Sequence, residues 1–317
     1  MLAVIEITPW HWVGFIACVF IFLAIDLGLF HRKAHVVTFK EALVWSTVWF
    51  CLAMAFALAM KPLRGEKESL QFLTGYLIEL SLSMDNVFVI ALIFAYFRIP
   101  AEHQHRVLYW GILGALVMRG LMIGFGVALI LWLNWILYVF GAFLLFSGVK
   151  MLFVDTEMHP EKNRVVRLVR RLYPVAPELD GQKFITFYNG KSALTPLALV
   201  LVMVETSDLI FAVDSIPAVF AVTTKPFVVF TSNVFAILGL RSLYFVLAGA
   251  IGYFRYLKFG LSLVLVFIGI KMLIDPHEQP PKWFQYDIPA SASLLGVAGI
   301  ILLSIIFSII AGKRDRK

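Results

Sequence analysis

Five acidic residues stand inside long apolar runs of this sequence, where carboxylates are rare. Glu79 and Asp85 lie in one run, and Glu205, Asp208 and Asp214 lie in another. Placing one charged side chain at the centre of a membrane helix costs roughly 2.5–3.5 kcal/mol, so such residues usually face a cavity, a partner charge or an ion. The five acids therefore predict an ion site at membrane depth.

The side chains around the acids supply further oxygen ligands. Asn86, Ser207 and Ser215 are candidate auxiliary ligands, whereas all 7 histidines fall at helix ends or in loops and neither of the 2 cysteines lies near the acids. Oxygen ligands suit Mn, Mg or Ca, while Zn and Cu sites recruit His or Cys. We therefore expect Mn²⁺ or another divalent cation as a bound and transported ion, together with protons, and no resident cofactor.

Two deep arginines, Arg119 and Arg241, are expected to pair with acids. If each pairs with one acid, three of the five carboxylates remain, and this excess excludes an anion and favours a cation. In the alternative, the acids only pair with the arginines to hold the helices together, but that role does not require the excess. Asp85 and Asp208 are the expected central ligands. The expected outer ligands or proton carriers are Glu79, Glu205 and Asp214.

Helical geometry does not place all five acids on one face. Asp214 follows Asp208 by six residues, about 240° round an unbroken helix, and Asp85 follows Glu79 by the same interval. Pro217 cannot donate to the carbonyl one turn back, so the run Asp214-Ser-Ile-Pro217 predicts a helix break. Such a break could return Asp214 to the same cavity as Asp208.

The composition identifies an integral membrane protein. The chain has 317 residues, of which 61% are hydrophobic and 15% charged, against about 25% charged in soluble domains. About 20 apolar residues span a bilayer as a helix. Nine such segments are predicted: residues 10–30, 41–60, 70–97, 107–127, 132–153, 193–222, 227–250, 256–274 and 289–311. The expected fold is an all-α membrane protein with nine transmembrane helices, forming a single transmembrane domain over residues 1–317.

Most of the 27 lysines and arginines lie on one side of the predicted membrane. With the N-terminus outside, 18 of them face the cytoplasm, five face outside and four lie within helices. Cytoplasmic loops are enriched in Lys and Arg, so we expect an outside N-terminus and a cytoplasmic C-terminus. This asymmetry, and not nucleic-acid binding, accounts for the net charge of +7. Lys150 and Lys271 lie near helix ends, where we expect them to reach interfacial water.

The chain contains an internal repeat of three helices, over residues 70–154 and 193–275. Three pairs of segments match at offsets of 121 to 123 residues: Phe146-Ser-Gly-Val-Lys150 with Phe267-Ile-Gly-Ile-Lys271, Arg119 with Arg241, and Asp85-Asn-Val-Phe88 with Asp208-Leu-Ile-Phe211. Because three is an odd number, the second copy enters the membrane from the opposite side. Inverted repeats of this kind build many secondary transporters, with the ion site near the midplane.

The two copies are joined by a basic hydrophilic loop, residues 155–192. Residues 163–172 place apolar side chains on one helical face and arginines on the other. This pattern predicts an amphipathic helix on the lipid of the inner membrane surface. A regulatory or partner-binding role is the alternative.

Two features of the first helices are less informative. Asp26 ends the first apolar run, where it either reaches interfacial water or lies on the ion path. Cys18 and Cys51 have no disulfide or metal spacing and are expected to be buried apolar thiols.

Four runs of the sequence resemble the TerC family of integral membrane proteins, and in particular its alkaline-inducible branch. They are Phe72-Leu-Thr-Gly-Tyr-Leu-Ile-Glu79, Met84-Asp-Asn-Val-Phe-Val89, Phe211-Ala-Val-Asp-Ser-Ile-Pro-Ala-Val-Phe-Ala-Val-Thr223 and Asn233-Val-Phe-Ala-Ile-Leu-Gly-Leu-Arg241. The resemblance implies a nine-helix bacterial inner-membrane protein related to the LysE-type exporter superfamily, with manganese export in some members. It also implies that the family's acidic positions are the five acids named above. An older family label, redox modulator, has no counterpart in this sequence, which carries no CxxC, haem, flavin or iron–sulfur signature.

These observations predict a secondary transporter that exports Mn²⁺ by alternating access around the acidic helices. Proton exchange is the expected driving force, because the sequence has no ATP-binding motif such as Walker A. The alternative is a membrane scaffold that binds partners in metal or tellurium stress without transport of its own. An enzyme is not expected, since no nucleophile–base pattern is present, and a homo-oligomer is compatible with the sequence.

Overall fold

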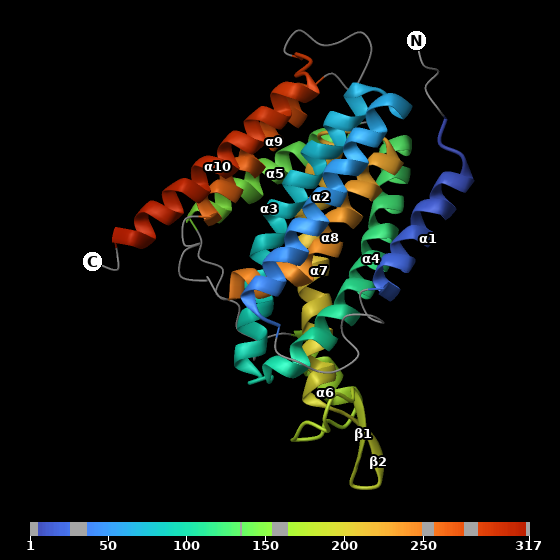
Figure 1. The fold of residues 1–317 in the computed structure, drawn as a ribbon, viewed down its shortest axis with the longest axis vertical. Helices are drawn as coiled ribbons and strands as arrows, with labels where there is room; N and C mark the ends of the chain where they lie inside the picture. The colour runs from blue at the N-terminus through green and yellow to red at the C-terminus, as the bar shows by residue number, and fades with distance from the viewer. Residues whose placement is uncertain are drawn as a thin grey trace.

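A computed structural model of the chain describes residues 6–25, 37–133, 135–153, 164–248, 257–275 and 285–314 (Figure 1). The helices in these ranges are α1 (Pro9–Ile25), α2 (Phe39–Arg64), α3 (Glu66–Tyr96), α4 (Ala101–Trp132), α5 (Ile136–Phe153), α6 (Arg164–Leu172), α7 (Pro196–Phe220), α8 (Pro226–Ala248), α9 (Leu257–Ile274) and α10 (Ala290–Arg314). Two short strands, β1 (Ile185–Tyr188) and β2 (Lys191–Leu194), form an antiparallel hairpin between α6 and α7.

Seven of the described helices are long and apolar enough to cross a membrane. They are α2, α3, α4, α5, α7, α8 and α10. The helix α1 is apolar but shorter, and α9 is not among the seven. The chain is therefore an all-helical membrane protein, and the count of nine spans stays a prediction.

Local sequence accounts for where the central helices begin. Thr38 caps α2 by accepting a hydrogen bond from the Glu41 backbone N at 3.3 Å, and Thr195 caps α7 in the same way, directly before Pro196. Both are residue types that favour helix starts. Gly65 joins α2 to α3 with a φ of +94°, a conformation that residues with a Cβ rarely adopt. These signals fix the starts of α2, α3 and α7.

The bundle exposes many large apolar side chains and buries several polar ones. Large hydrophobic residues such as Trp132 and Leu295 are more than 70% exposed, as expected for side chains that meet lipid. In contrast, Thr231, Ser232 and Asn233 of α8 are fully buried. The helix α8 is the most enclosed of the candidate spans. Polar side chains thus lie within a largely apolar interior.

The helices pack in pairs taken from the two halves of the chain. The helix α3 packs on α8, α4 packs on α7, and α5 packs on α9, while α10 lies against α3 and α9. In Figure 1 α6 and the hairpin lie together at one end of the bundle. The helices α3, α4, α7 and α8 surround Glu79 and Asp208.

The basic loop contains both a predicted and an unpredicted element. The expected amphipathic helix is α6, in which Val166 packs on the bundle while Leu168 and Leu172 stay exposed. The hairpin was not predicted, although Asn189-Gly190 is a strong signal for a two-residue hairpin turn. Both residues have positive φ, at 50° and 74°.

The cysteines differ from the expectation. Cys18 on α1 and Cys51 on α2 are exposed free thiols. Both helices lie at the periphery of the bundle, so these side chains can be apolar without being buried in the protein.

Candidate ion site

Arg119 of α4 is the centre of the buried polar network. Its side chain is only 2% exposed, although it is long and charged. It donates to Asp208 through Nη2 to Oδ1 at 2.9 Å and through Nε to Oδ2 at 3.3 Å, which is a two-pronged contact with one carboxylate. Nη1 donates to Asn233 Oδ1 at 2.9 Å and to Ser215 Oγ at 3.3 Å. The guanidinium is therefore held by α7 and α8 together.

The second carboxylate on Arg119 comes from α3. Glu79 is fully buried and forms an ion pair with Arg119. Within the described ranges, neither Glu79 oxygen accepts a hydrogen bond beyond this ion pair. Asn86, two turns further along α3, donates to Asp208 Oδ1 at 3.3 Å. One cation thus pairs with two carboxylates, one from each half of the chain, and leaves a net negative charge.

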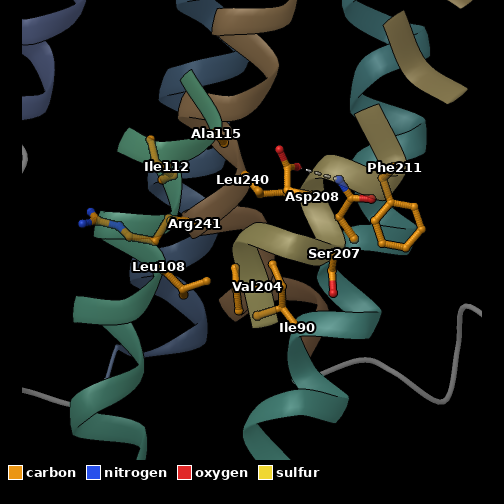
Figure 2. Close-up of a pocket in the computed structure, with 12 residues that line it drawn as sticks. Ile90, Leu108, Ile112, Ala115, Val204, Ser207, Asp208, Phe211, Leu240 and Arg241 are labelled. Carbon is orange, nitrogen blue, oxygen red and sulfur yellow. Dashed lines mark hydrogen bonds between the residues drawn. The ribbon is translucent and has the colours of Figure 1, made fainter. Parts of the chain in front are cut away.

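A small cavity adjoins Asp208 (Figure 2). Its volume is about 20 Å³, and Asn86, Ser207 and Asp208 line it together with apolar residues of α3, α4, α7 and α8. A site of roughly 10–15 Å³ holds one water molecule. The cavity therefore has room for a species of about that size next to the carboxylate.

Arg241 differs from Arg119 in its direction. It lies at the edge of the same cavity, but Figure 2 shows its guanidinium pointing away from Asp208. It also lines a second small cavity with Trp45 and Trp49 of α2. The two arginines match in the sequence repeat, yet Arg119 is the one that contacts Glu79 and Asp208.

Asp214 faces a different helix from Asp208. The predicted break at Pro217 is wrong, since α7 runs without interruption from Pro196 to Phe220. Pro217 lies in the last turn, so the hydrogen bond that it cannot donate is lost only near the helix end. Asp214 consequently stays on another face, and Ser147 Oγ of α5 donates to its Oδ1 at 2.8 Å.

The remaining two acids also lie apart from Arg119. Glu205 is half-buried over Gly114 of α4, so closely that a Cβ at Gly114 would clash with its carboxylate. Asp85 is half-buried on α3, where the charge of Lys258 at the start of α9 acts on it. Among the residues that the structure describes, no three acidic, histidine or cysteine side chains are placed to hold one metal ion.

The structure thus gathers part of the predicted set. The residues that meet are Glu79, Asp208, Arg119, Asn86, Ser207 and Ser215. Asp85 and Asp214 lie apart from this group, Glu205 faces α4 at Gly114 about one turn before Asp208, and Asp26 lies outside the described residues. Sequence reasoning missed Asn233 and Ser147. A buried amide or hydroxyl inside an apolar run is the signal that could have indicated them.

The fold and this network define a multi-pass membrane protein with a buried, arginine-neutralised acidic site. Residues 64–316 match the Integral membrane protein TerC family, and the chain belongs to this family.

Several relatives are similar over nearly their whole length. The chain is 53% identical to an "Uncharacterized membrane protein STKORF319" of Myxococcus xanthus over 308 residues, 96% of this chain and 94% of the relative. It is 49% identical to the "Putative membrane-bound redox modulator Alx" of Escherichia coli K12 over 311 residues, 95% and 94% of the two chains. An uncharacterised membrane protein of Rickettsia bellii is 38% identical over 292 residues, 92% and 97% of the two chains. No solved structure matches the chain.

Proposed function

We propose that this protein is a secondary transporter that exports Mn²⁺ from the cytoplasm, in exchange for protons, without enzymatic activity. The observation that carries the proposal is Arg119, whose cation sits between Glu79 and Asp208. A purely structural pair would need one carboxylate, and a second one raises the desolvation cost. The two carboxylates suit a site in which Arg119 and a divalent cation alternate.

The ligands around Asp208 favour a hard cation as the transported ion. Asn86 and Ser207 line the cavity beside it, and Ser215 and Asn233 face Arg119. All of these groups offer oxygen, which Mn²⁺ accepts readily and for which Zn²⁺ has no special preference. When the ion leaves, Arg119 or protons can neutralise the carboxylates.

The acids mark successive depths along α3 and α7. These helices run in opposite directions, so Asp85 and Glu205 lie nearer the hairpin end than the pair Glu79 and Asp208. Asp214 lies about 9 Å beyond Asp208 on the other side, at 1.5 Å per residue. In this proposal the three outlying acids pass ions or protons to and from the central pair.

Reciprocal contacts between α5 and α9 support an inverted repeat. A Cβ on Gly148 would lie 2.9 Å from the Val266 backbone N, and one on Gly269 would lie 2.7 Å from the Leu145 backbone N. Adding the repeat offset of 121 to Gly148 and Leu145 gives Gly269 and Val266. Contacts that exchange in this way are typical of two-fold symmetry. The repeats, residues 70–154 and 193–275, would then rock against each other across the site.

The transport proposal includes an orientation, with the N-terminus outside and the C-terminus in the cytoplasm of the bacterial inner membrane. The expected result is that a C-terminal reporter is active only when it is of the cytoplasmic type. The reason is the excess of Lys and Arg on the hairpin side of the bundle. A C-terminal periplasmic reporter with full activity would contradict both the orientation and the direction of transport.

The direct test of function is Mn²⁺ movement in vesicles that contain the purified protein. We expect Mn²⁺ uptake driven by a pH gradient, with Zn²⁺ transported less well than its higher general affinity would give. The matched control is Asp208→Asn. A site that prefers Zn²⁺ and is built on His103 and His105, two histidines near the start of α4, would contradict the proposal.

A scaffold without transport of its own remains the second candidate. The hairpin favours it, because Ile185 and Phe187 share one face of β1 and are 59% and 84% exposed. If the purified protein moves no Mn²⁺ in vesicles while loss of the hairpin abolishes its effect in cells, the scaffold is the better description.

A further inference from the structure

A second polar cavity opens at the end of the bundle opposite the hairpin. It has a volume of about 750 Å³ and lies among the start of α3, the ends of α7 and α9, and the start of α10. Gln71, Lys271, Asp275 and Asp287 are among its polar lining residues. None of these side chains contacts Arg119 or the acids around it, so the central site does not explain them.

Lys271 of α9 is buried at this cavity. It is only 4% exposed, so the expectation that it reaches interfacial water is wrong. Its Nζ donates to the Ala221 carbonyl at 2.8 Å and forms an ion pair with Asp275. Ala221 is the C-cap of α7, and the carbonyls at a helix C-terminus carry partial negative charge that favours cations. The Lys271 ammonium therefore sits in a ready-made cation site.

Gln71 of α3 supplies an oxygen that is not used within the protein. The residue is 8% exposed, and its Nε2 donates to the Val222 carbonyl at 3.2 Å. Because Val222 offers an acceptor, the amide nitrogen must face it and Oε1 must face the other way. Within the described ranges, Oε1 accepts no hydrogen bond. A buried group without a partner costs about 1–3 kcal/mol, so such a group indicates an absent ligand or water.

We propose that the C-terminal carbonyls of α7, the Asp275 carboxylate and Gln71 Oε1 form a release site for a divalent cation. Lys271 is its built-in occupant, as Arg119 is the occupant of the central site. This inference rests on the proposed transport function and adds an outer site to it. An ion that reaches this site displaces the Lys271 ammonium, and the return of the ammonium expels the ion. A release site must bind its ion weakly enough for the ion to leave. Competition from the Lys271 ammonium lowers the affinity for the ion.

The repeat provides a matched control for Lys271. Lys150 of α5 is its counterpart at an offset of 121, but it is exposed. Its charge acts on Asp214. Substituting either lysine removes one positive charge from the same type of helix end. A difference between the two substitutions therefore reports the site around Lys271 and not net charge.

The test counts Mn²⁺ bound to the purified protein by electron paramagnetic resonance titration. All variants carry Asp208→Asn, so that the central site does not contribute. We expect Lys271→Met to bind one Mn²⁺ per chain more than the Asp208→Asn parent, and Asp275→Asn added to it to abolish the gain. Lys150→Met is expected to show no gain. Where Lys271→Met does not fold, Lys271→Gln keeps a donor for the Ala221 carbonyl and is expected to give the same gain.

Two outcomes separate this inference from the function on which it rests. If the unmodified chain and Asp208→Asn bind Mn²⁺ equally but Lys271→Met still adds an ion, the central site fails and the release site stands. If the Lys271 variants bind no more Mn²⁺ than Lys150→Met, the release site is wrong whatever the result at Asp208.

Discussion

Replacing Arg119 by alanine is expected to make the stability of this protein depend on Mn²⁺. The change leaves Glu79 and Asp208 buried without the cation that contacts both. Removing one partner of a buried ion pair destabilises a protein by about 3–5 kcal/mol. Saturating Mn²⁺ should recover much of this, since a ligand at 100 times its Kd stabilises by about 2.7 kcal/mol. Thermal unfolding in detergent, with and without Mn²⁺, measures the effect.

The controls for this prediction come from the same network. Arg241→Ala removes the repeat-related arginine, whose guanidinium points away from Asp208, and should not create a dependence on Mn²⁺ (Figure 2). Arg119→Ala combined with Asp208→Asn removes one of the two unpaired buried charges and should restore part of the stability without metal. If Arg119→Ala unfolds at the same temperature with and without Mn²⁺, the arginine and the metal do not share a site.

The sequence predicted which residues matter better than it predicted how they meet. Carboxylates inside long apolar runs are visible in the sequence alone, and so are the two arginines, Arg119 and Arg241. Whether Asp214 lies on the same face as Asp208 depended on the path of α7 at Pro217. Because the helix continues there, Asp214 stays on a different face. The difference between Arg119 and Arg241 depended on neighbouring side chains of other helices, which no local pattern specifies.

The same division holds for the fold. Long apolar segments predicted the spans, and the alternation of arginine and apolar residues predicted α6. The burial of Lys271 could not be predicted, because a lysine near a helix end usually extends to water. Its site exists only because the C-terminus of α7 packs beside α9, which is a tertiary contact.

Neutralising Asp208 is expected to abolish Mn²⁺ transport, whereas neutralising Asp214 should only reduce it. Asp208→Asn keeps the size of the side chain but removes the charge that faces Arg119 at 2.9 Å. A loss of about 3 kcal/mol corresponds to roughly 100-fold in affinity. Asp214→Asn can keep the bond to Ser147, so its expected loss is at most about tenfold, or 1.4 kcal/mol. Initial rates of Mn²⁺ uptake into vesicles at equal protein density measure both.

The comparison of the two variants also locates the central ligand. Both substitutions remove one negative charge from α7, so a general effect of charge would reduce transport equally. A larger loss in Asp208→Asn would follow from its contacts with Arg119 and Asn86, which connect α7 to α4 and α3. Equal losses, or a larger loss in Asp214→Asn, would instead move the central ligand toward α5, where Ser147 lies. In that case Arg119 would hold Glu79 and Asp208 as a structural group, and the ion would pass on the other face of α7.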